Sequence, residues 1–194
     1  MRGIERIKID SSWNDWRIKM SKDLSPTSSM LYRKIFDLLD GEEDITCSKK
    51  DAISRYDWKE GIDVLLHFTN GTKATLQEKF LDWKDDTCTF EEVKTDGTPG
   101  VWYYCTAQYY FVGYARRYKE EHILQFQSYI MVDLPGLHRA DLSKKLPWYR
   151  NQNRNDGRKA TFRYLYFKDV PEDVVISIYP SNKSQVKIYQ PGLF

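Results

Sequence analysis

The stretch 61-GIDVLLHFTNGTKATLQEKF-80 predicts a β-hairpin. Two apolar runs, residues 62–68 and 74–80, are rich in residues that favour strands. Between them lies the pair Asn70-Gly71, which is a strong short-range signal for a tight turn. A turn of this kind brings the two runs side by side as antiparallel strands.

Polar residues interrupt both runs of this hairpin. Successive side chains of a strand point to opposite faces, so Gln77 and Lys79 share one face and Glu78 points to the other. Asp63 lies on the neighbouring strand, where its carboxylate is expected to meet the Gln77 amide and the Lys79 ammonium. Carboxylate and amide oxygens are the ligands that Mg2+ prefers, so the group predicts a metal site. The alternative interpretation is a hairpin with ordinary solvated polar residues.

The hairpin is expected to belong to a central mixed β-sheet in an α/β (α+β) domain. A helix is predicted from Ser28 or Ser29 to Gly41, because apolar residues repeat there at helical spacing after a capping hydroxyl. A second, short helix is predicted after Asp133, with a proline in its first turn. Further strands are predicted over 87–93, 108–115 and 123–132, and in ATFRYLYF and VVISIY.

The composition is that of one folded domain in a chain of 194 residues with a net charge of +2. Residues 1–27 are interpreted as an N-terminal arm or edge segment, and residues 28–194 as a single domain. The three cysteines are far apart and odd in number, which favours reduced thiols. The sequence has no apolar run long enough to span a bilayer and no signal-peptide core, so we expect a soluble, cytoplasmic protein.

Asp63, followed after a turn by Gln77-Glu78-Lys79, resembles the catalytic core of the PD-(D/E)XK nuclease superfamily in its Q-x-K variant. The resemblance covers mainly residues 28–132, and it implies a restriction-endonuclease-like core that cleaves DNA with Mg2+, or with Mn2+ as the alternative ion. Asp63, Gln77 and Lys79 would be the catalytic residues. Asp63, Gln77 and the backbone carbonyl of Glu78 would bind the metal.

The Q-x-K form departs from the common pattern at Gln77, because an amide is a weaker metal ligand than a carboxylate. A further carboxylate is therefore sought, and Asp37 and Asp57 are the two candidates. Two alternatives stay open. One is an inactive nucleic-acid-binding module with a nuclease-like fold, and the other is a homodimeric nuclease that selects branched DNA. A virus or a mobile element is the expected source of a stand-alone nuclease.

The segment 144–163 carries seven Lys or Arg and one Asp, although the whole chain has a net charge of only +2. Such a basic segment can neutralise phosphates, and its aromatic residues can stack on bases. A solvated basic loop is the alternative. The nucleic-acid-binding residues predicted here are Lys144, Lys145, Trp148, Tyr149, Arg150, Arg154, Arg158 and Lys159.

Overall fold

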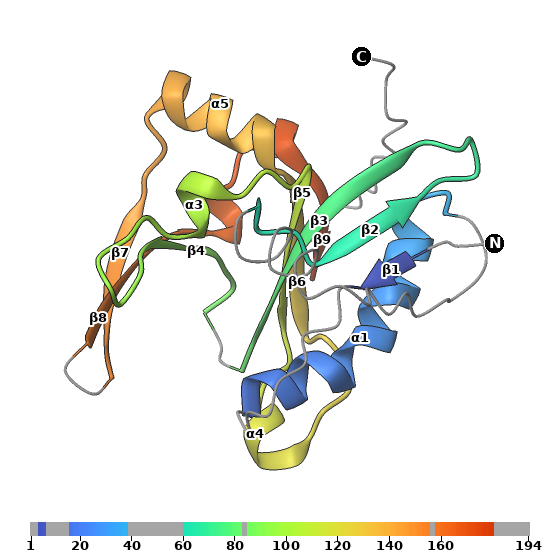
Figure 1. Ribbon diagram of the computed structural model, residues 1–194, viewed down its shortest axis with the longest axis horizontal. Coiled ribbons are helices and arrows are strands. Elements are labelled where there is room, and N and C mark those ends of the chain that lie inside the picture. The colour runs from blue at the N-terminus through green and yellow to red at the C-terminus, as the bar shows by residue number, and fades with distance from the viewer. Residues whose placement is uncertain (1–3, 7–15, 39–59, 83–84, 156–157, 181–194) are drawn as a thin grey trace.

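The computed structural model describes residues 4–6, 16–38, 60–82, 85–155 and 158–180, which form two β-sheets with helices against them (Figure 1). The larger sheet has six strands in the order β1-β2-β3-β5-β6-β9, and the smaller has three in the order β4-β8-β7. Strands β3 and β5 are parallel and the other pairs are antiparallel. The predicted mixed α/β class and mixed central sheet are therefore confirmed.

The strands of the larger sheet are β1 (Ile4–Arg6), β2 (Val64–His67), β3 (Lys73–Leu81), β5 (Tyr109–Tyr114), β6 (Ser128–Asp133) and β9 (Val175–Tyr179). Those of the smaller sheet are β4 (Thr87–Val93), β7 (Tyr149–Asn155) and β8 (Arg158–Tyr166). The helices are α1 (Trp16–Ile35), α3 (Val101–Tyr104), α4 (Tyr118–Glu121), α5 (Leu134–Lys144) and the 3-10 turns η2 (Phe167–Asp169) and η3 (Glu172–Val174).

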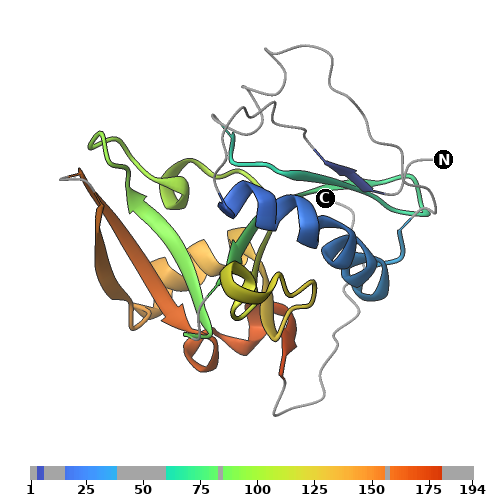
Figure 2. The ribbon, with the colours of Figure 1, turned by 90° about the horizontal axis from the view of Figure 1, so that it is seen from below.

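The two faces of the larger sheet are covered by different elements. Helix α1 packs on one face, where Tyr32 joins a buried cluster with Leu76 and Phe111. Helix α5 and the smaller sheet cover the other face, where Leu137 and Phe90 join a second buried cluster. Figure 2 shows α1 running alongside the hairpin strands, with the smaller sheet projecting at the opposite side of the molecule.

The predicted hairpin is present as β2 and β3. Val64 pairs with Leu76 and Leu66 with Ala74, so the buried residues of both strands fall on the same face. Gly71 adopts φ 82°, a left-handed conformation that glycine adopts without steric cost, and its N–H donates to the Phe68 carbonyl at 3.0 Å. The Asn-Gly signal therefore located the turn, although the loop has three residues, 69–71, between the paired Phe68 and Thr72.

Helix α1 begins at Trp16, well before the predicted start at Ser28. Pro26 lies inside the helix, and Ser25 and Ser28 return their hydroxyls to carbonyls of the preceding turn at 2.6 and 3.1 Å. Proline and hydroxyl residues usually mark helix boundaries, so they concealed a continuous helix. Burial of Met20 and Leu24 stabilises the first half of the helix in spite of this local composition.

The basic segment is not a loop, because β7 and β8 form an antiparallel hairpin across most of it. Tyr149 pairs with Tyr164 and Gln152 with Thr161. The second helix prediction is confirmed: Asp133 caps α5 by accepting a hydrogen bond from the Gly136 N–H at 3.0 Å. The hairpin was missed because Asn, Gln and Arg dominate β7, and these residues carry little strand preference.

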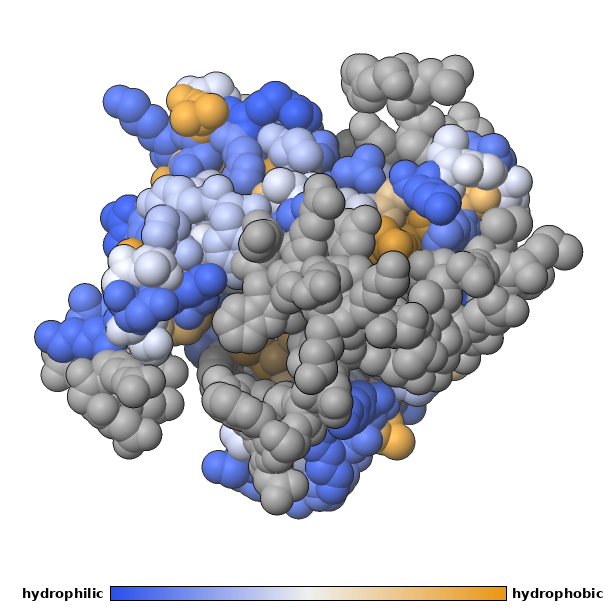
Figure 3. Space-filling view, viewed as in Figure 1, coloured by the Kyte–Doolittle hydropathy of each residue, from blue (hydrophilic) through white to orange (hydrophobic). Residues whose placement is uncertain are grey.

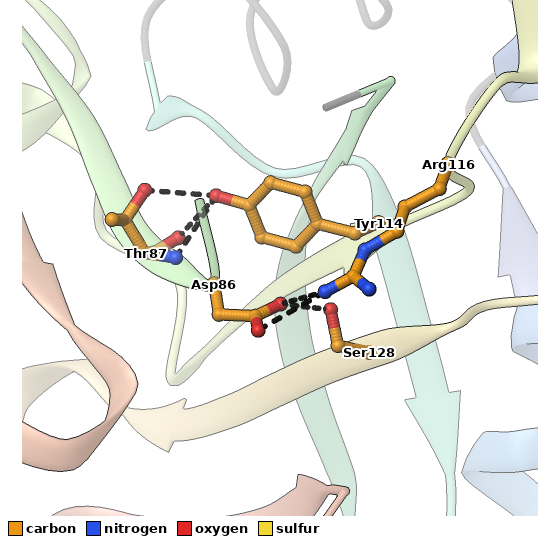
Figure 4. A network of polar contacts seen from close by, with 5 residues as sticks. All are labelled: Asp86, Thr87, Tyr114, Arg116 and Ser128. Atoms are coloured by element: carbon orange, nitrogen blue, oxygen red, sulfur yellow. Dashed lines mark hydrogen bonds and ion pairs between the residues drawn. The ribbon is translucent and has the colours of Figure 1, made fainter. Parts of the chain in front are cut away.

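A polar network fastens the start of β4 to the larger sheet (Figure 4). The Arg116 guanidinium lies 3.3 and 3.2 Å from the two carboxylate oxygens of Asp86, and the Ser128 hydroxyl also donates to Asp86. The buried Tyr114 hydroxyl accepts from the Thr87 N–H at 3.0 Å and donates to the Thr87 carbonyl at 2.8 Å. These bonds hold β4 against β5 and β6 although β4 pairs with neither.

Among the described residues visible in Figure 3, most are hydrophilic, and the hydrophobic spots are small and separated from one another. Among the described residues, no helix has the length and hydrophobicity that a bilayer-spanning segment needs.

Candidate active site

Asp63 is placed by the backbone immediately before β2. Its N–H donates to the Leu76 carbonyl at 3.0 Å, which extends the β2–β3 ladder by one residue. Two residues earlier, Gly61 adopts φ 60°, and a Cβ at that position would lie 3.1 Å from the Cys105 sulfur. Glycine therefore allows the chain to turn closely past Cys105 and deliver Asp63 to the sheet.

The structure brings Asp63 and Gln77 into direct contact across the hairpin. The Gln77 side-chain nitrogen donates to Asp63 Oδ2 and also to the backbone carbonyl of Glu78 at 3.1 Å. Asp63 Oδ2 accepts a further bond from the Glu78 N–H at 2.8 Å. The three groups predicted to bind metal thus converge, with the Gln77 amide between a carboxylate and a carbonyl oxygen.

The Glu78 side chain lies on the opposite face of β3, as the alternation predicted. Its Oε1 accepts hydrogen bonds from the Ser28 hydroxyl at 2.9 Å and the Tyr32 hydroxyl at 2.6 Å, both on α1. Helix α1 therefore holds β3 from behind at the residue whose backbone contacts Asp63. Only the backbone of Glu78 is on the side of the candidate site.

Lys79 shares the face of Gln77, but its ammonium extends toward the smaller sheet. Its Nζ donates to the Thr89 carbonyl at 3.4 Å and lies 5.0 Å from the centre of the Phe162 ring. Burial lowers the pKa of Lys79 to about 8, while the nearby Glu91 carboxylate opposes that change. At neutral pH the ammonium is mostly charged, yet it loses its proton far more readily than an exposed lysine.

Glu91, on β4, is a charged neighbour of Lys79 that the sequence did not single out. Burial raises the pKa of Glu91, and the charge of Lys79 acts in the other direction. A Cβ at Gly100 would lie 2.3 Å from the Glu91 carbonyl oxygen, so the loop before α3 packs directly on this residue. Nothing local in the sequence indicated that β4 would belong to a second sheet and pass Lys79.

The two described cysteines lie close to the site but are not nucleophiles. The Cys105 thiol donates to the Gly61 carbonyl at 3.1 Å, and burial raises its pKa to about 12. Burial also raises the pKa of Cys88. A thiol reacts as its thiolate, and these two stay protonated at neutral pH. Cys88 and Cys105 are buried and not joined in a disulfide, while Cys47 lies outside the described residues.

Asp37, one of the two candidates for the further carboxylate, is not brought to Asp63. Asp37 bonds through its carboxylate and its carbonyl to Thr69, at the turn end of the hairpin. Thr69 lies six residues beyond Asp63, which corresponds to about 20 Å of extended strand. Asp57 lies outside the described residues. Within 16–38, 60–82, 85–155 and 158–180, no three His, Cys, Asp or Glu side chains are grouped as metal ligands.

The predicted nucleic-acid-binding residues divide between the two faces of the β7–β8 hairpin. Trp148 packs against Phe90 and Trp102 in the core and donates to Asp141, so it is not available to stack on a base. Arg150 forms two bonds to Glu92, at 2.8 and 3.0 Å, on that same inner side.

The other predicted binding residues lie at the ends and on the outer face of the hairpin. Lys145, the C-cap of α5, and Lys159 are exposed. Tyr149 is 44% exposed on the outer face of the hairpin. The side chains of Lys144, Arg154 and Arg158 lie outside the described part of the chain.

Comparisons of the chain with family models, with curated proteins and with solved structures gave no match in any of the three. The functional argument therefore depends on the geometry of the residues themselves.

Proposed function

We propose that this protein is a metal-dependent nuclease of the PD-(D/E)XK type, which hydrolyses phosphodiester bonds of DNA. The observation that carries the proposal is the convergence of the Asp63 carboxylate, the Gln77 amide and the Glu78 carbonyl on one hairpin. Lys79 lies on the same strand face as Gln77. This is the arrangement of residue types that the resemblance assigns to catalysis.

The donor groups fit a hard divalent cation. Asp63 supplies one carboxylate and the Glu78 carbonyl one neutral oxygen, and rotation of the Gln77 amide by a half-turn would direct its oxygen toward the same point. Mg2+ is commonly held by one or two carboxylates together with water and substrate phosphate, and Mn2+ accepts similar ligands. When bound, such an ion lowers the pKa of a coordinated water, which can then attack phosphorus.

Lys79 would act on the phosphate. Its ammonium is mostly charged at neutral pH and the side chain is half-buried, so its electrostatic attraction for a negative phosphate oxygen is screened less than that of an exposed lysine. The bond to the Thr89 carbonyl is long, at 3.4 Å, and costs little to exchange for a phosphate contact. Glu91 helps to retain the proton on Lys79 until the negative substrate arrives.

A second candidate function is a nucleic-acid-binding module with a nuclease-like fold and no catalysis. The Gln77 amide nitrogen already donates to the Asp63 carboxylate, and the described residues contain no group of three or more His, Cys, Asp or Glu side chains that could hold a metal. An ion that binds Asp63 would have to replace these internal hydrogen bonds, which lowers the affinity of the site for a metal. The two candidates differ in one property, which is the affinity of Asp63 for a divalent cation.

Two measurements on the wild type and on Asp63→Asn test the proposal. We expect calorimetry to detect Mg2+ or Mn2+ binding to the wild type with DNA present, and labelled linear, single-stranded and branched DNA to be cleaved with Mg2+ but not with chelator. Asp63→Asn should lose both. Metal binding by neither protein, together with intact DNA in every reaction, would reject the nuclease and leave the binding module.

A further inference from the structure

Three tyrosines form a cluster on the outer face of the smaller sheet. Tyr164 and Tyr166 are two residues apart on β8 and therefore share a face, and Tyr149 pairs with Tyr164 across from β7. The Tyr149 and Tyr164 rings are stacked at 5.5 Å, and the Tyr166 ring lies 5.2 Å from Tyr149 and 5.8 Å from Tyr164. Tyr149 is 44% exposed and Tyr166 is 36% exposed.

This tyrosine cluster is continuous with the candidate active site. Phe162 precedes Tyr164 by two residues on the same face of β8, and its ring is the one beside the Lys79 ammonium at 5.0 Å. One step along a strand face spans about 7 Å. A ligand lying on the tyrosines would therefore reach Phe162 and Lys79 within one or two such steps.

A lysine borders the cluster on one side. Lys168 lies 5.8 Å from the centre of the Tyr166 ring, whereas Lys159 belongs to the opposite face of β8. Two carboxylates oppose this charge. Asp85 is close enough to Tyr164 to contribute to its raised pKa, of which burial is the largest cause, and Glu91 pairs with Phe162 across from β4. Figures 1 and 2 both show β7 and β8 projecting from the body on the side away from α1.

We propose that Tyr149, Tyr164 and Tyr166 form a stacking platform for the unpaired bases of single-stranded DNA, which lead from the platform toward Lys79. Exposed tyrosines also favour strand structure in general. Here, however, three rings are grouped, are bordered by lysine and adjoin the candidate site. Aromatic rings on an exposed sheet with cations nearby are how proteins bind single strands with little sequence preference. The bases of a duplex are stacked on each other, and their faces are not accessible to the rings.

The platform rests on the proposed function for its ligand, but it can be tested without catalysis. Binding is measured in chelator by the fluorescence anisotropy of a labelled oligothymidylate of about 15 nucleotides, the upper range for one such site, and of a blunt duplex of equal length. We expect Tyr166→Ala to weaken single-strand binding by about 5- to 100-fold. Tyr166→Phe keeps the ring and should stay within about twofold of the wild type.

Two controls keep the result interpretable. Tyr179→Ala removes a tyrosine of the larger sheet that is 51% exposed and stacks on Tyr129 at 5.9 Å, so it should not alter binding. Photo-crosslinking of wild-type protein to an oligonucleotide containing iododeoxyuridine needs no variant, and should label peptides containing Tyr149, Tyr164 or Tyr166. Crosslinks confined to other peptides, or equal affinity of Tyr166→Ala and the wild type, would overturn the platform.

Failure of the platform and failure of the nuclease give different results. If Tyr166→Ala binds normally while Asp63-dependent cleavage is present, the platform is wrong and the nuclease stands. If Tyr166→Ala loses single-strand binding but no protein cleaves DNA, the nuclease is wrong and the platform stands.

Discussion

The carboxylate of Asp63 accepts the backbone N–H of Glu78 at 2.8 Å, so a residue proposed to bind metal also stabilises the hairpin that carries it. Removing Asp63 therefore has two consequences, one for chemistry and one for folding. Substitutions that separate the two are more informative than alanine alone.

Asp63→Asn keeps an oxygen that can accept the Glu78 N–H but removes the negative charge. We expect cleavage to fall by about 100-fold or more with little loss of stability. Asp63→Ala should lose the same activity and in addition about 1–3 kcal/mol of unfolding free energy, because it leaves a partly buried N–H without an acceptor. Urea denaturation and a cleavage assay measure the two effects. Asp37→Ala, at the far end of the hairpin, is the control and should cleave as the wild type does.

Lys79→Met should make the protein more stable and inactive. Burial of a charged ammonium is unfavourable, and a tenfold change in proton affinity is worth about 1.4 kcal/mol, so we expect a gain of roughly 1 to 3 kcal/mol at pH 7. The pKa of Lys79 in the folded protein lies below the ordinary 10.5. As the pH rises from about 8 toward 10.5, the folded protein buries a neutral amine instead of an ammonium, and the wild type becomes more stable. The advantage of Lys79→Met should shrink over that interval. A variant less stable than the wild type at pH 7 would contradict the burial of the charge.

Cleavage should decline as the pH rises through about 8, because the charged form of Lys79 is the one that attracts phosphate and it is lost above its pKa. Lys79→Arg stays protonated throughout this range and should shift the decline to higher pH, even if its maximal rate is lower. Initial rates at fixed metal concentration between pH 6 and 10 give the comparison. Identical profiles for lysine and arginine would show that another group sets the pH dependence.

Tyr114→Phe should lower the unfolding free energy by about 1–3 kcal/mol, since it leaves the buried N–H and carbonyl of Thr87 without their shared partner. The variant keeps the ring against Phe167. It touches neither Asp63 nor the outer face of the smaller sheet, so DNA binding at low temperature should not change. Thermal unfolding and anisotropy together test this, and a change in both would mean that the network reaches the site.

The parts of the fold that were predictable are those coded locally. The sequence of the hairpin contains the turn signal Asn70-Gly71, and the sequence before α5 contains its capping residue, Asp133. The smaller sheet was not predictable, because β4 pairs with β8, a strand far along the chain, and β7 has few strand-forming residues. Only the pairing of distant strands brings Glu91 and Phe162 to Lys79.

The prediction of the candidate site was correct where the site depends on one hairpin. It was wrong where the site depends on contacts between distant parts of the chain. The meeting of Asp63 and Gln77 followed from a turn of known type. Asp37 came from the resemblance, which places it on the first helix, but α1 ends at Ile35 and Asp37 lies beyond it, bonded to Thr69. Trp148 was predicted to be an exposed, base-stacking residue because its segment is basic, but it packs in the core against Phe90 and Trp102.

Arg163 lies with its guanidinium 4.6 Å from the ring centre of Trp102 and 4.1 Å from that of Trp148, and it is also 3.5 Å from Asp141. Because this arginine is buried between indoles, dissolved ions screen its attraction far less than they screen contacts between exposed lysines and phosphates. A wash in concentrated salt during purification should therefore remove any nucleic acid that copurifies with the protein, while the packing of Arg163 between the two indoles is retained. Protein washed in this way would carry no bound nucleic acid and would be suitable for measuring its affinity for DNA.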